Sequence, residues 1–466
     1  MDAPLIEKPY WQDTIDFPQL DASRPLPAKA DVAIVGGGYT GLAAARELAK
    51  RGASVVVLEQ NTFGWGASSR NGGMVLTGTK LSAGKLLKRY SKQVARDLWC
   101  GSMDAIAYIE KLVQDEGIAC DFARAGHLEL AWKPSHYDGY QHEAELLNKA
   151  FQHPVELIAP KDLPNEIGSS LYHGGLLDKA SAGVNPAQYA AGLMRAAMKA
   201  GAVLFNKTQV TRIASTGRGQ SQTGPYEVTT LRGKITAREV LIATNGYTGA
   251  ATPELQRKIV PVGSYIIATE PLSEDLARSC IPQRRMVYDS KNFLYYWRLS
   301  HNTPSAILPN VELAKAEAYS SNLREDARSN ETRMIFGGRA SFMPETPNTV
   351  RESAEILRKG MLEVHPQLKD VQVAYAWGGT LGFTFDLLPH AGQTKDGLHY
   401  ALGCGGHGVA MLSHLGASVA KRMAGEADNN PIFNLPMPGA PLGLYNGNPW
   451  FLPLAGMYYR VLDWLS

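Results

Sequence analysis

Three glycines with the spacing Gly-x-Gly-x-x-Gly lie in the run Gly36-Gly37-Gly38-Tyr39-Thr40-Gly41. The first glycine permits a tight turn, the second lets the backbone approach a pyrophosphate, and the third allows a helix to pack closely on a strand. The N-terminus of the helix that follows offers N–H groups and a partial positive charge to phosphates. This spacing therefore predicts a dinucleotide-binding turn.

Glu59 and the segments around the glycines supply the context that such a turn needs. The β-branched run 31–35 precedes it, apolar residues recur at helical spacing over 39–51, and a second β-branched run spans 55–58. Glu59, followed by Gln60, ends this second strand, where a carboxylate accepts hydrogen bonds from ribose hydroxyls. The segment thus predicts one βαβ unit that holds a dinucleotide. This context disfavours the alternative, a glycine turn without a ligand.

A loop rich in glycine and polar residues follows, with the sequence Gly64-Trp65-Gly66-Ala67-Ser68-Ser69-Arg70-Asn71-Gly72-Gly73. It offers hydroxyls, an amide, a guanidinium and a glycine pair within a short span. Such a loop can wrap the far half of an extended dinucleotide and lie against a planar ring, which favours FAD over NAD. A polar surface loop is the alternative, but it would not need both glycine pairs.

The elements that must position these residues alternate between helical and strand patterns. The chain predicts helices over 95–112, 186–200, 351–364 and 409–423. It predicts strands over 226–231, 239–243, 264–269, 293–299, 333–337, 371–377 and 398–402, a strand pair over 122–132 that turns at Ala125-Gly126, and a polar surface insertion over 300–332.

Composition narrows the class of protein. The 466 residues carry 47 Lys+Arg and 44 Asp+Glu, a net charge of +3, so there is no strong field for nucleic acid. The length exceeds what one core usually supports, which indicates about two domains. Four widely spaced cysteines form no disulfide or zinc pattern, and no export signal or membrane span is visible, so we expect a cytoplasmic protein.

The aromatic C-terminal stretch, 451–465, is the nearest thing to a membrane anchor. It mixes aromatics with Pro453, Arg460 and Asp463. Packing on the body of the protein is favoured over a membrane contact. The sequence does not specify an oligomeric state.

These motifs together resemble a known family. DVAIVGGGYTGLAAARELAKRG, Glu59 and GWGASSRNGG are similar to the N-terminal third of the D-amino-acid-oxidase-like (DAO) flavoprotein superfamily, and the GASxRNGG form resembles its γ-glutamylputrescine oxidase branch most closely. The resemblance returns at VLIATNGYTG (240–249), Trp377-Gly378-Gly379 and Gly403-Cys404-Gly405-Gly406-His407-Gly408-Val409. It implies an α/β plus α+β fold: a Rossmann-like FAD-binding domain with an antiparallel-sheet substrate domain, as in the glutathione-reductase-2-like fold.

The resemblance also implies a discontinuous domain arrangement. We expect the FAD-binding domain to comprise 1–90, 180–255 and 370–425, and the substrate domain 91–179 and 256–369. Residues 426–466 would form a tail that packs on the body or contacts a membrane.

Carried over residue by residue, the resemblance implies a set of FAD contacts. The pyrophosphate would lie at Gly36, Gly38, Tyr39, Thr40 and Gly41, and the adenosine ribose at Glu59 and Gln60. The flavin would lie along Gly66, Ala67, Ser68, Arg70, Asn71, Gly72 and Gly73, with Val210 on the adenine side, Gly246 nearby, and Gly406, His407, Gly408 and Val409 at the pyrimidine edge. The N-terminus of the last helix would then face the part of the flavin where negative charge collects on reduction.

Two departures from the family pattern bear on the mode of FAD binding. Sarcosine-type members attach FAD through a Cys that aligns near Gly379 and carry a Lys where Ala410 stands, and other members use a His in the segment equivalent to 67–71. These residues are not present, so we expect non-covalent FAD and disfavour a sarcosine oxidase.

The substrate is expected to contact the antiparallel sheet, where the candidate residues are Tyr265, Tyr295, Tyr296, Trp297, Arg298 and Arg339. Alternation places Tyr296 and Arg298 on one face of their strand and Tyr295 and Trp297 on the other. We predict Tyr296, Arg298 and His407 as the catalytic set. Arg298 either holds a substrate carboxylate or is an exposed arginine at a strand edge, and His407 either lies at the flavin or caps the helix.

The expected reaction is oxidation of a C–N bond of a small amine or amino acid. Hydride passes from the α-carbon of a neutral amine to flavin N5, water hydrolyses the imine, and O2 becomes H2O2. The first alternative is a dehydrogenase that passes electrons to a quinone at the membrane, which the aromatic tail would favour. The second is a flavin-binding protein without catalytic activity.

Overall fold

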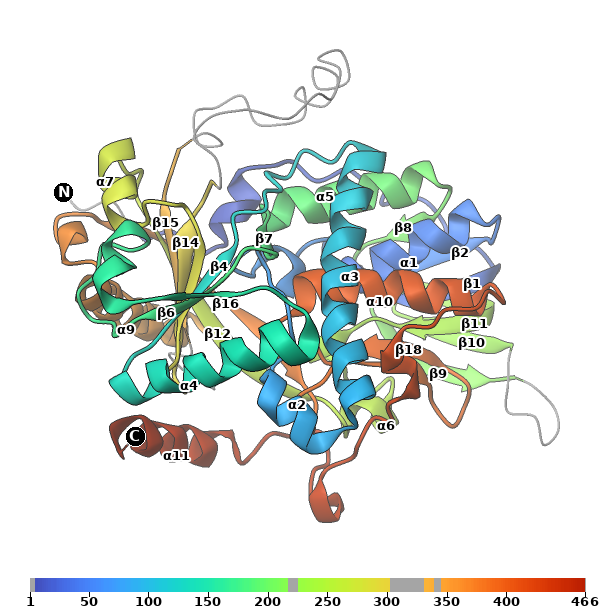
Figure 1. Cartoon of the computed structure of the whole chain (residues 1–466). Helices are drawn as coiled ribbons and strands as arrows, with labels where there is room; N and C mark the ends of the chain where they lie inside the picture. The colour runs from blue at the N-terminus through green and yellow to red at the C-terminus, as the bar shows by residue number, and fades with distance from the viewer. Residues whose placement is uncertain (1–4, 217–224, 302–330, 339–344, 466) are drawn as a thin grey trace.

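The computed structural model describes residues 5–216, 225–301, 331–338 and 345–465. Two large sheets stand side by side, and helices α3 (Lys92–Glu116) and α10 (Gly408–Met423) cross the middle of the molecule (Figure 1). The first sheet runs in the order β17-β18-β11-β1-β2-β8, with β9 and β10 continuing from β11. Its strands are β1 (Lys29–Val35), β2 (Val55–Leu58), β8 (Val203–Phe205), β9 (Val210–Ser215), β10 (Tyr226–Thr230), β11 (Gly233–Ile242), β17 (His390–Gln393) and β18 (His399–Leu402).

The predicted βαβ unit forms the centre of the first sheet. β1 pairs in parallel with both β2 and β11, and α1 (Tyr39–Lys50) connects β1 to β2. Leu42, Ala45 and Leu48 of this helix are buried, because apolar residues at helical spacing face the sheet and the neighbouring helices α5 (Pro186–Lys199) and α10 (Gly408–Met423). Because α1 begins directly after β1 ends, its N-terminus lies at the carboxyl end of the parallel strands. Open α/β sheets bind ligands at this end.

The second sheet is largely antiparallel, in the order β16-β12-β15-β14-β13-β4-β6-β5. Its strands are β4 (His127–Leu130), β5 (Glu156–Ile158), β6 (Gly175–Asp178), β12 (Val260–Thr269), β13 (Met286–Asp289), β14 (Tyr295–Leu299), β15 (Met334–Gly338) and β16 (Val373–Phe383). Helix α9 (Pro347–Val364) covers one face with Val350, Leu357 and Met361. Further strands and helices are β3 (Met74–Val75), β7 (Ala182–Gly183), α2 (Ala83–Arg89), α3 (Lys92–Glu116), α4 (Pro134–Leu146), α6 (Pro253–Gln256) and α7 (Glu274–Cys280).

The expected strand pair over 122–132 is wrong. The segment contains one strand, β4, which pairs with β6 and β13 and not with its own flank. Two elements connect the sheets across the expected domain bounds. Strand β16, within 370–425, pairs with β12 in the second sheet, and helix α3, within 91–179, packs on α10 beside the first sheet. Pairing partners distant in sequence decide these placements, and local patterns do not report them.

The C-terminal segment begins on the body of the protein and then exposes apolar side chains. The Tyr445 hydroxyl donates to the Ile259 carbonyl at 2.8 Å, and Leu452 is buried beside Val260. In helix α11 (Leu452–Leu465), by contrast, Leu454 and Tyr458 are 58% and 61% exposed. Among the described helices, none combines the length and apolarity that crossing a bilayer requires.

Candidate active site

A cavity with a volume of about 920 Å3 lies between the sheets and is lined by both of them. Most of the predicted site residues lie on its wall. These are Gly36, Gly38, Tyr39, Thr40, Glu59, Gln60, Gly66, Ala67, Ser68, Arg70, Asn71, Gly72, Val210, Tyr296, Gly406, His407, Gly408 and Val409. Four predicted residues, Gly41, Gly73, Gly246 and Arg298, are not among the lining residues.

The glycine turn is packed so tightly that side chains are excluded. A Cβ at Gly36, whose φ is +107°, would lie 2.7 Å from the Ala243 carbonyl oxygen, and a Cβ at Gly41 would lie 2.0 Å from the Gly36 carbonyl oxygen. Gly41 therefore serves close packing of α1 on the turn, which leaves the backbone of Gly36 and Gly38 to face the cavity.

Glu59 lies beside this turn, at the end of β2. Its Oε2 accepts from the Gly37 N–H and its Oε1 from the Asn61 N–H, both at 2.8 Å. Burial raises the pKa of the carboxyl. Since each carboxylate oxygen has two lone pairs, both oxygens can still accept from a hydroxyl in the cavity.

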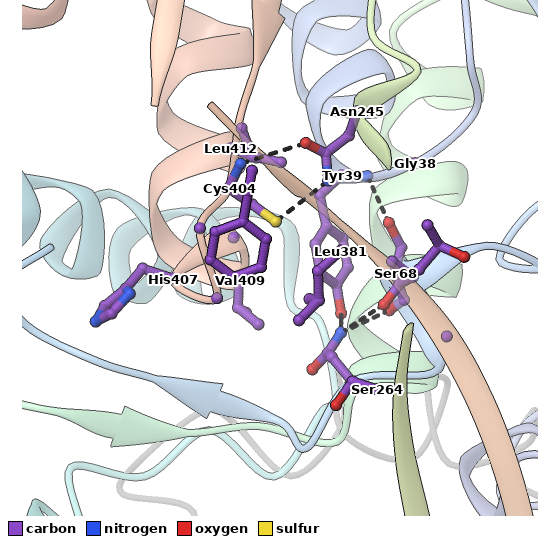
Figure 2. Close-up of a pocket in the computed structure, with 18 of the residues that line it drawn as sticks. Gly38, Tyr39, Ser68, Asn245, Ser264, Leu381, Cys404, His407, Val409 and Leu412 are labelled. Atoms are coloured by element: carbon purple, nitrogen blue, oxygen red, sulfur yellow. Dashed lines mark hydrogen bonds between the residues drawn. The ribbon is translucent and has the colours of Figure 1, made fainter. Parts of the chain in front are cut away.

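The loop after β2 is held against the helix N-terminus and the second sheet. The Ser68 hydroxyl accepts from the Tyr39 N–H at 3.0 Å (Figure 2). Asn71 Oδ1 accepts from the Gly73 N–H at 2.8 Å, and the Arg70 guanidinium donates to the Gly378 carbonyl and the Glu345 carboxylate at 2.9 Å. The loop is thus a preformed wall that bridges the two sheets.

Asn245 is a lining residue that the sequence prediction missed in favour of Gly246. Its Oδ1 accepts from the backbone N–H groups of Gly403 and Cys404 at 3.0 and 3.3 Å, and its Nδ2 lies 3.2 Å from Cys404 Sγ (Figure 2). Gly246 instead packs on the backbone of β16, where a Cβ would lie 2.9 Å from Leu381. The signal was present, since Asn is the residue besides Gly that most readily adopts a left-handed turn, and Asn245 has φ of +44°.

His407 stands immediately before α10 and lines the cavity. Its side chain forms no hydrogen bond that caps the helix, so the capping alternative is not supported. Its Nδ1 is buried without a hydrogen-bond partner among the described residues. Burial, together with the charge of Lys80, lowers the pKa of the imidazole to about 4, so His407 is neutral at physiological pH.

Tyr296 and Arg298 share a face of β14, as alternation predicted, but their surroundings differ. The Tyr296 hydroxyl lies 3.1 Å from Ser264 Oγ and faces the cavity. The Arg298 guanidinium is fully buried and donates to the carbonyls of Gly73 and Val184 at 2.8 Å. Neither expectation for Arg298 fits, because the side chain is neither exposed nor on the cavity wall. It instead supports from behind the loop 64–73, called the cofactor loop below after the contact expected of it. Arg339, also considered, lies outside the described residues.

The opposite wall of the cavity carries polar side chains that sequence reasoning did not select. They come from β4, β13, α4 and the segment before α2, and comprise Lys80, His127, Glu129, Tyr140, Glu143 and Tyr288. His127 and Glu129 alternate within the predicted 122–132 strand segment. That spacing could have indicated one polar face, but nothing local shows that the face lines a cavity.

Comparison with known proteins places the chain in a family. The family model described as FAD dependent oxidoreductase, DAO, matches residues 31–422, which include both sheets and the cavity wall. The chain is a member of the DAO family. The DAO family comprises FAD-dependent oxidoreductases that act on C–N bonds of amines and amino acids, so this chain is an enzyme of that class. The resemblance inferred from GxGxxG, Glu59 and GASxRNGG is confirmed.

Individual relatives agree with this placement. The chain is 30% identical over 443 residues to the probable oxidoreductase OrdL of Haemophilus influenzae, covering 93% of this chain and 92% of that protein. It is 30% identical over 438 residues to γ-glutamylputrescine oxidoreductase of Escherichia coli, covering 94% and 93%. The crystal structure of glycine oxidase from Geobacillus kaustophilus aligns with a TM-score of 0.68 at 21% identity, over 89% of this chain and 100% of that one. The predicted fold class is confirmed.

The lining residues fit FAD on three observations. The N-termini of α1 and α10 both open on one cavity, which provides two positions for negative charge. The glycine turn beside Glu59 excludes side chains. At the other helix, His407 Nδ1 is an orphaned buried polar atom that a flavin edge can satisfy.

Proposed function

We propose that this protein is an oxidase that converts the C–N bond of a small amine or amino acid to an imine, which water hydrolyses, with O2 as acceptor and H2O2 as product. One observation carries the proposal. A single cavity combines a glycine turn and two helix N-termini at one side with a wall of tyrosines and carboxylates at the other. The first side suits a dinucleotide and the second a polar substrate nitrogen.

The residues of the chain have distinct roles in this proposal. When bound, FAD supplies the two-electron acceptor. The glycine turn and Glu59 would hold its adenosine and pyrophosphate, and loop 66–72 its middle and ring. Tyr296, hydrogen-bonded to Ser264, orients the substrate. Neutral His407 and the α10 N-terminus would favour negative charge on a flavin edge held beside them.

Turnover measurements test the proposal. The purified flavoprotein would be mixed without oxygen with a panel of amines and amino acids while flavin absorbance at its visible maximum is followed. Peroxide would then be measured in air. Bleaching and peroxide with the same compound support an oxidase, whereas bleaching without peroxide contradicts O2 as acceptor. Turnover of any compound also eliminates a flavin-binding protein without activity.

A dehydrogenase that reduces a membrane quinone is the second candidate, and the C-terminal segment favours it. Trp450, Leu454, Met457 and Tyr458 are each more than half exposed, and clustered apolar side chains of this kind suit a membrane interface. Co-sedimentation with vesicles, together with bleaching that yields no peroxide, would favour this alternative. Removal of 449–466 should then abolish co-sedimentation.

We propose that FAD is bound without a covalent link and that the protein is cytoplasmic. The four cysteines are free, which suits a reducing compartment. Acid precipitation is expected to release all the flavin into the supernatant and to leave a colourless pellet. Cys404 and His407 are nucleophiles on the cavity wall. A flavin-labelled peptide containing either of them would contradict this expectation.

A further inference from the structure

One row of side chains crosses the second sheet on the face that lines the cavity. Backbone register aligns Tyr296 of β14 with Tyr288 of β13, and Tyr288 with Glu129 of β4. All three side chains line the cavity. Because partners in register project to the same face, the row leads from the Tyr296 hydroxyl beside Ser264 to a carboxylate at the far wall.

The charge of Glu129 is only partly compensated. Lys80 on the same wall lowers the pKa of the carboxyl through its charge, but among the described residues Glu129 forms no ion pair, and the Tyr288 hydroxyl donates to it over a long 3.4 Å. The same hydroxyl lies 3.2 Å from His127 Nε2. The other carboxylates nearby are satisfied: Asp178 accepts from His153 at 2.6 Å, and Glu143 accepts from the Ala83 N–H.

Tyr140 provides an independent sign that a ligand belongs here. Its side chain lines the cavity beside Glu129, and it is 8% exposed. Its hydroxyl is buried close to Glu129 and Ser290 but forms a hydrogen bond of good geometry with neither. Buried hydroxyls are ordinarily paired, so Glu129 and Tyr140 together leave an unfilled position for a group that both donates hydrogen bonds and carries positive charge.

We propose that Glu129, with Tyr140 and Tyr288, binds a protonated nitrogen of the substrate that is remote from the C–N bond being oxidised, so that diamines and their derivatives are the substrate class. This inference rests on the proposed function. An ammonium group supplies donors for the carboxylate and both hydroxyls, and a half-buried carboxylate on a cavity wall is stabilised by such a partner.

The paired nitrogen is not the one that reacts. Hydride leaves the carbon of a neutral amine, whose nitrogen lone pair stabilises the developing positive charge. An ion pair with Glu129 keeps a nitrogen protonated and removes that lone pair from use. The two nitrogens of the substrate therefore have different environments, and the row of side chains between them sets their separation.

The protonation of Glu129 gives the inference a pH signature. Burial raises the pKa of its carboxyl to about 7, opposed by Tyr140 and Lys80 and reinforced by Glu143. The other titratable groups at this wall are His127 on β4, Tyr288 on β13, Asp178 on β6 and His136 on α4, with His407 across the cavity. Burial keeps the pKa of His127 and His407 low, so these two histidines stay neutral. Below about pH 7, the empty site loses its negative charge.

The experiment compares isosteric ligands on the FAD-loaded enzyme. The probes are 1,4-diaminobutane against pentylamine and 1,6-diaminohexane against heptylamine, which exchange one ammonium for a methyl group. Equilibrium binding is read without oxygen from the perturbed flavin spectrum, and the rate of bleaching is read separately. The wild-type enzyme should bind at least one diamine at least about tenfold more tightly than its monoamine, and this preference should shrink as the pH falls below 7.

Variants separate the cation site from a structural role. E129Q keeps the shape of the side chain and should bring the diamine-to-monoamine ratio close to one at every pH, and Y140F should reduce the ratio partly. E156Q, on an exposed glutamate of β5 paired with Lys179, should keep the wild-type ratio and pH dependence. Far-ultraviolet circular dichroism and flavin content verify that each variant folds.

Three outcomes would overturn the inference: no preference for diamines at either length, a preference unchanged in E129Q, or no spectral perturbation by either diamine at millimolar concentration. Diamine binding without bleaching would leave the cation site standing and contradict the proposed oxidation. The failure of one proposal is therefore distinguishable from the failure of the other.

Discussion

Replacing Gly41 with alanine weakens FAD binding by about 100-fold, corresponding to about 3 kcal/mol. The added Cβ would lie 2.0 Å from the Gly36 carbonyl oxygen and 3.2 Å from Ile34 Cγ2. The first contact is with backbone, so no side-chain rotation relieves it, and α1 must move off the turn. That movement displaces the N–H groups that face the cavity. Flavin fluorescence during titration with FAD measures the change.

A matched helical glycine provides the control for this effect. Gly101 lies in α3, where an added Cβ would meet Pro431 at 3.6 Å, an ordinary contact. G101A should therefore bind FAD as the wild type does, and its better helix propensity should leave it at least as stable. FAD affinity within a factor of three of wild type in G41A would show that the turn can relax.

Replacing Arg298 with methionine is expected to lower the midpoint of thermal unfolding by about 5 °C and to weaken FAD binding. The guanidinium donates to the carbonyls of Gly73, Val184 and Leu299. Methionine fills a similar volume but donates nothing, so β14 loses its polar link to the end of the cofactor loop. Burial already lowers the pKa of Arg298 to about 10, and the group remains charged at neutral pH.

Two comparisons distinguish this supporting role from a substrate clamp. R238M removes an arginine whose side chain is 68% exposed, and it should leave the midpoint unchanged. If Arg298 instead held a substrate carboxylate, R298M would raise KM for amino acids but not for amines, at unchanged thermal stability. Differential scanning calorimetry and steady-state kinetics on the same preparations decide between these roles.

Strand β14 shows that local sequence predicts the face on which a side chain lies but not what surrounds it there. Alternation correctly placed Tyr296 and Arg298 on one face, because successive strand residues point to opposite sides whatever surrounds them. It could not report that Tyr296 faces open space while Arg298 lies under the cofactor loop. That difference depends on Gly73 and Val184, which other segments bring to the strand.

The sequence by itself determined the glycine turn, the helix that follows it, and Glu59 at the end of β2. These residues lie within one continuous βαβ unit, where backbone geometry and short-range spacing fix their relations. The tertiary structure alone decided the polar cavity wall that carries Glu129, Tyr140 and Tyr288. Glu129 and Tyr288 lie 159 residues apart and meet only through the pairing of β4 with β13, while Tyr140 arrives on a separate helix. No local pattern encodes that pairing, because strand register is set by packing across the whole sheet.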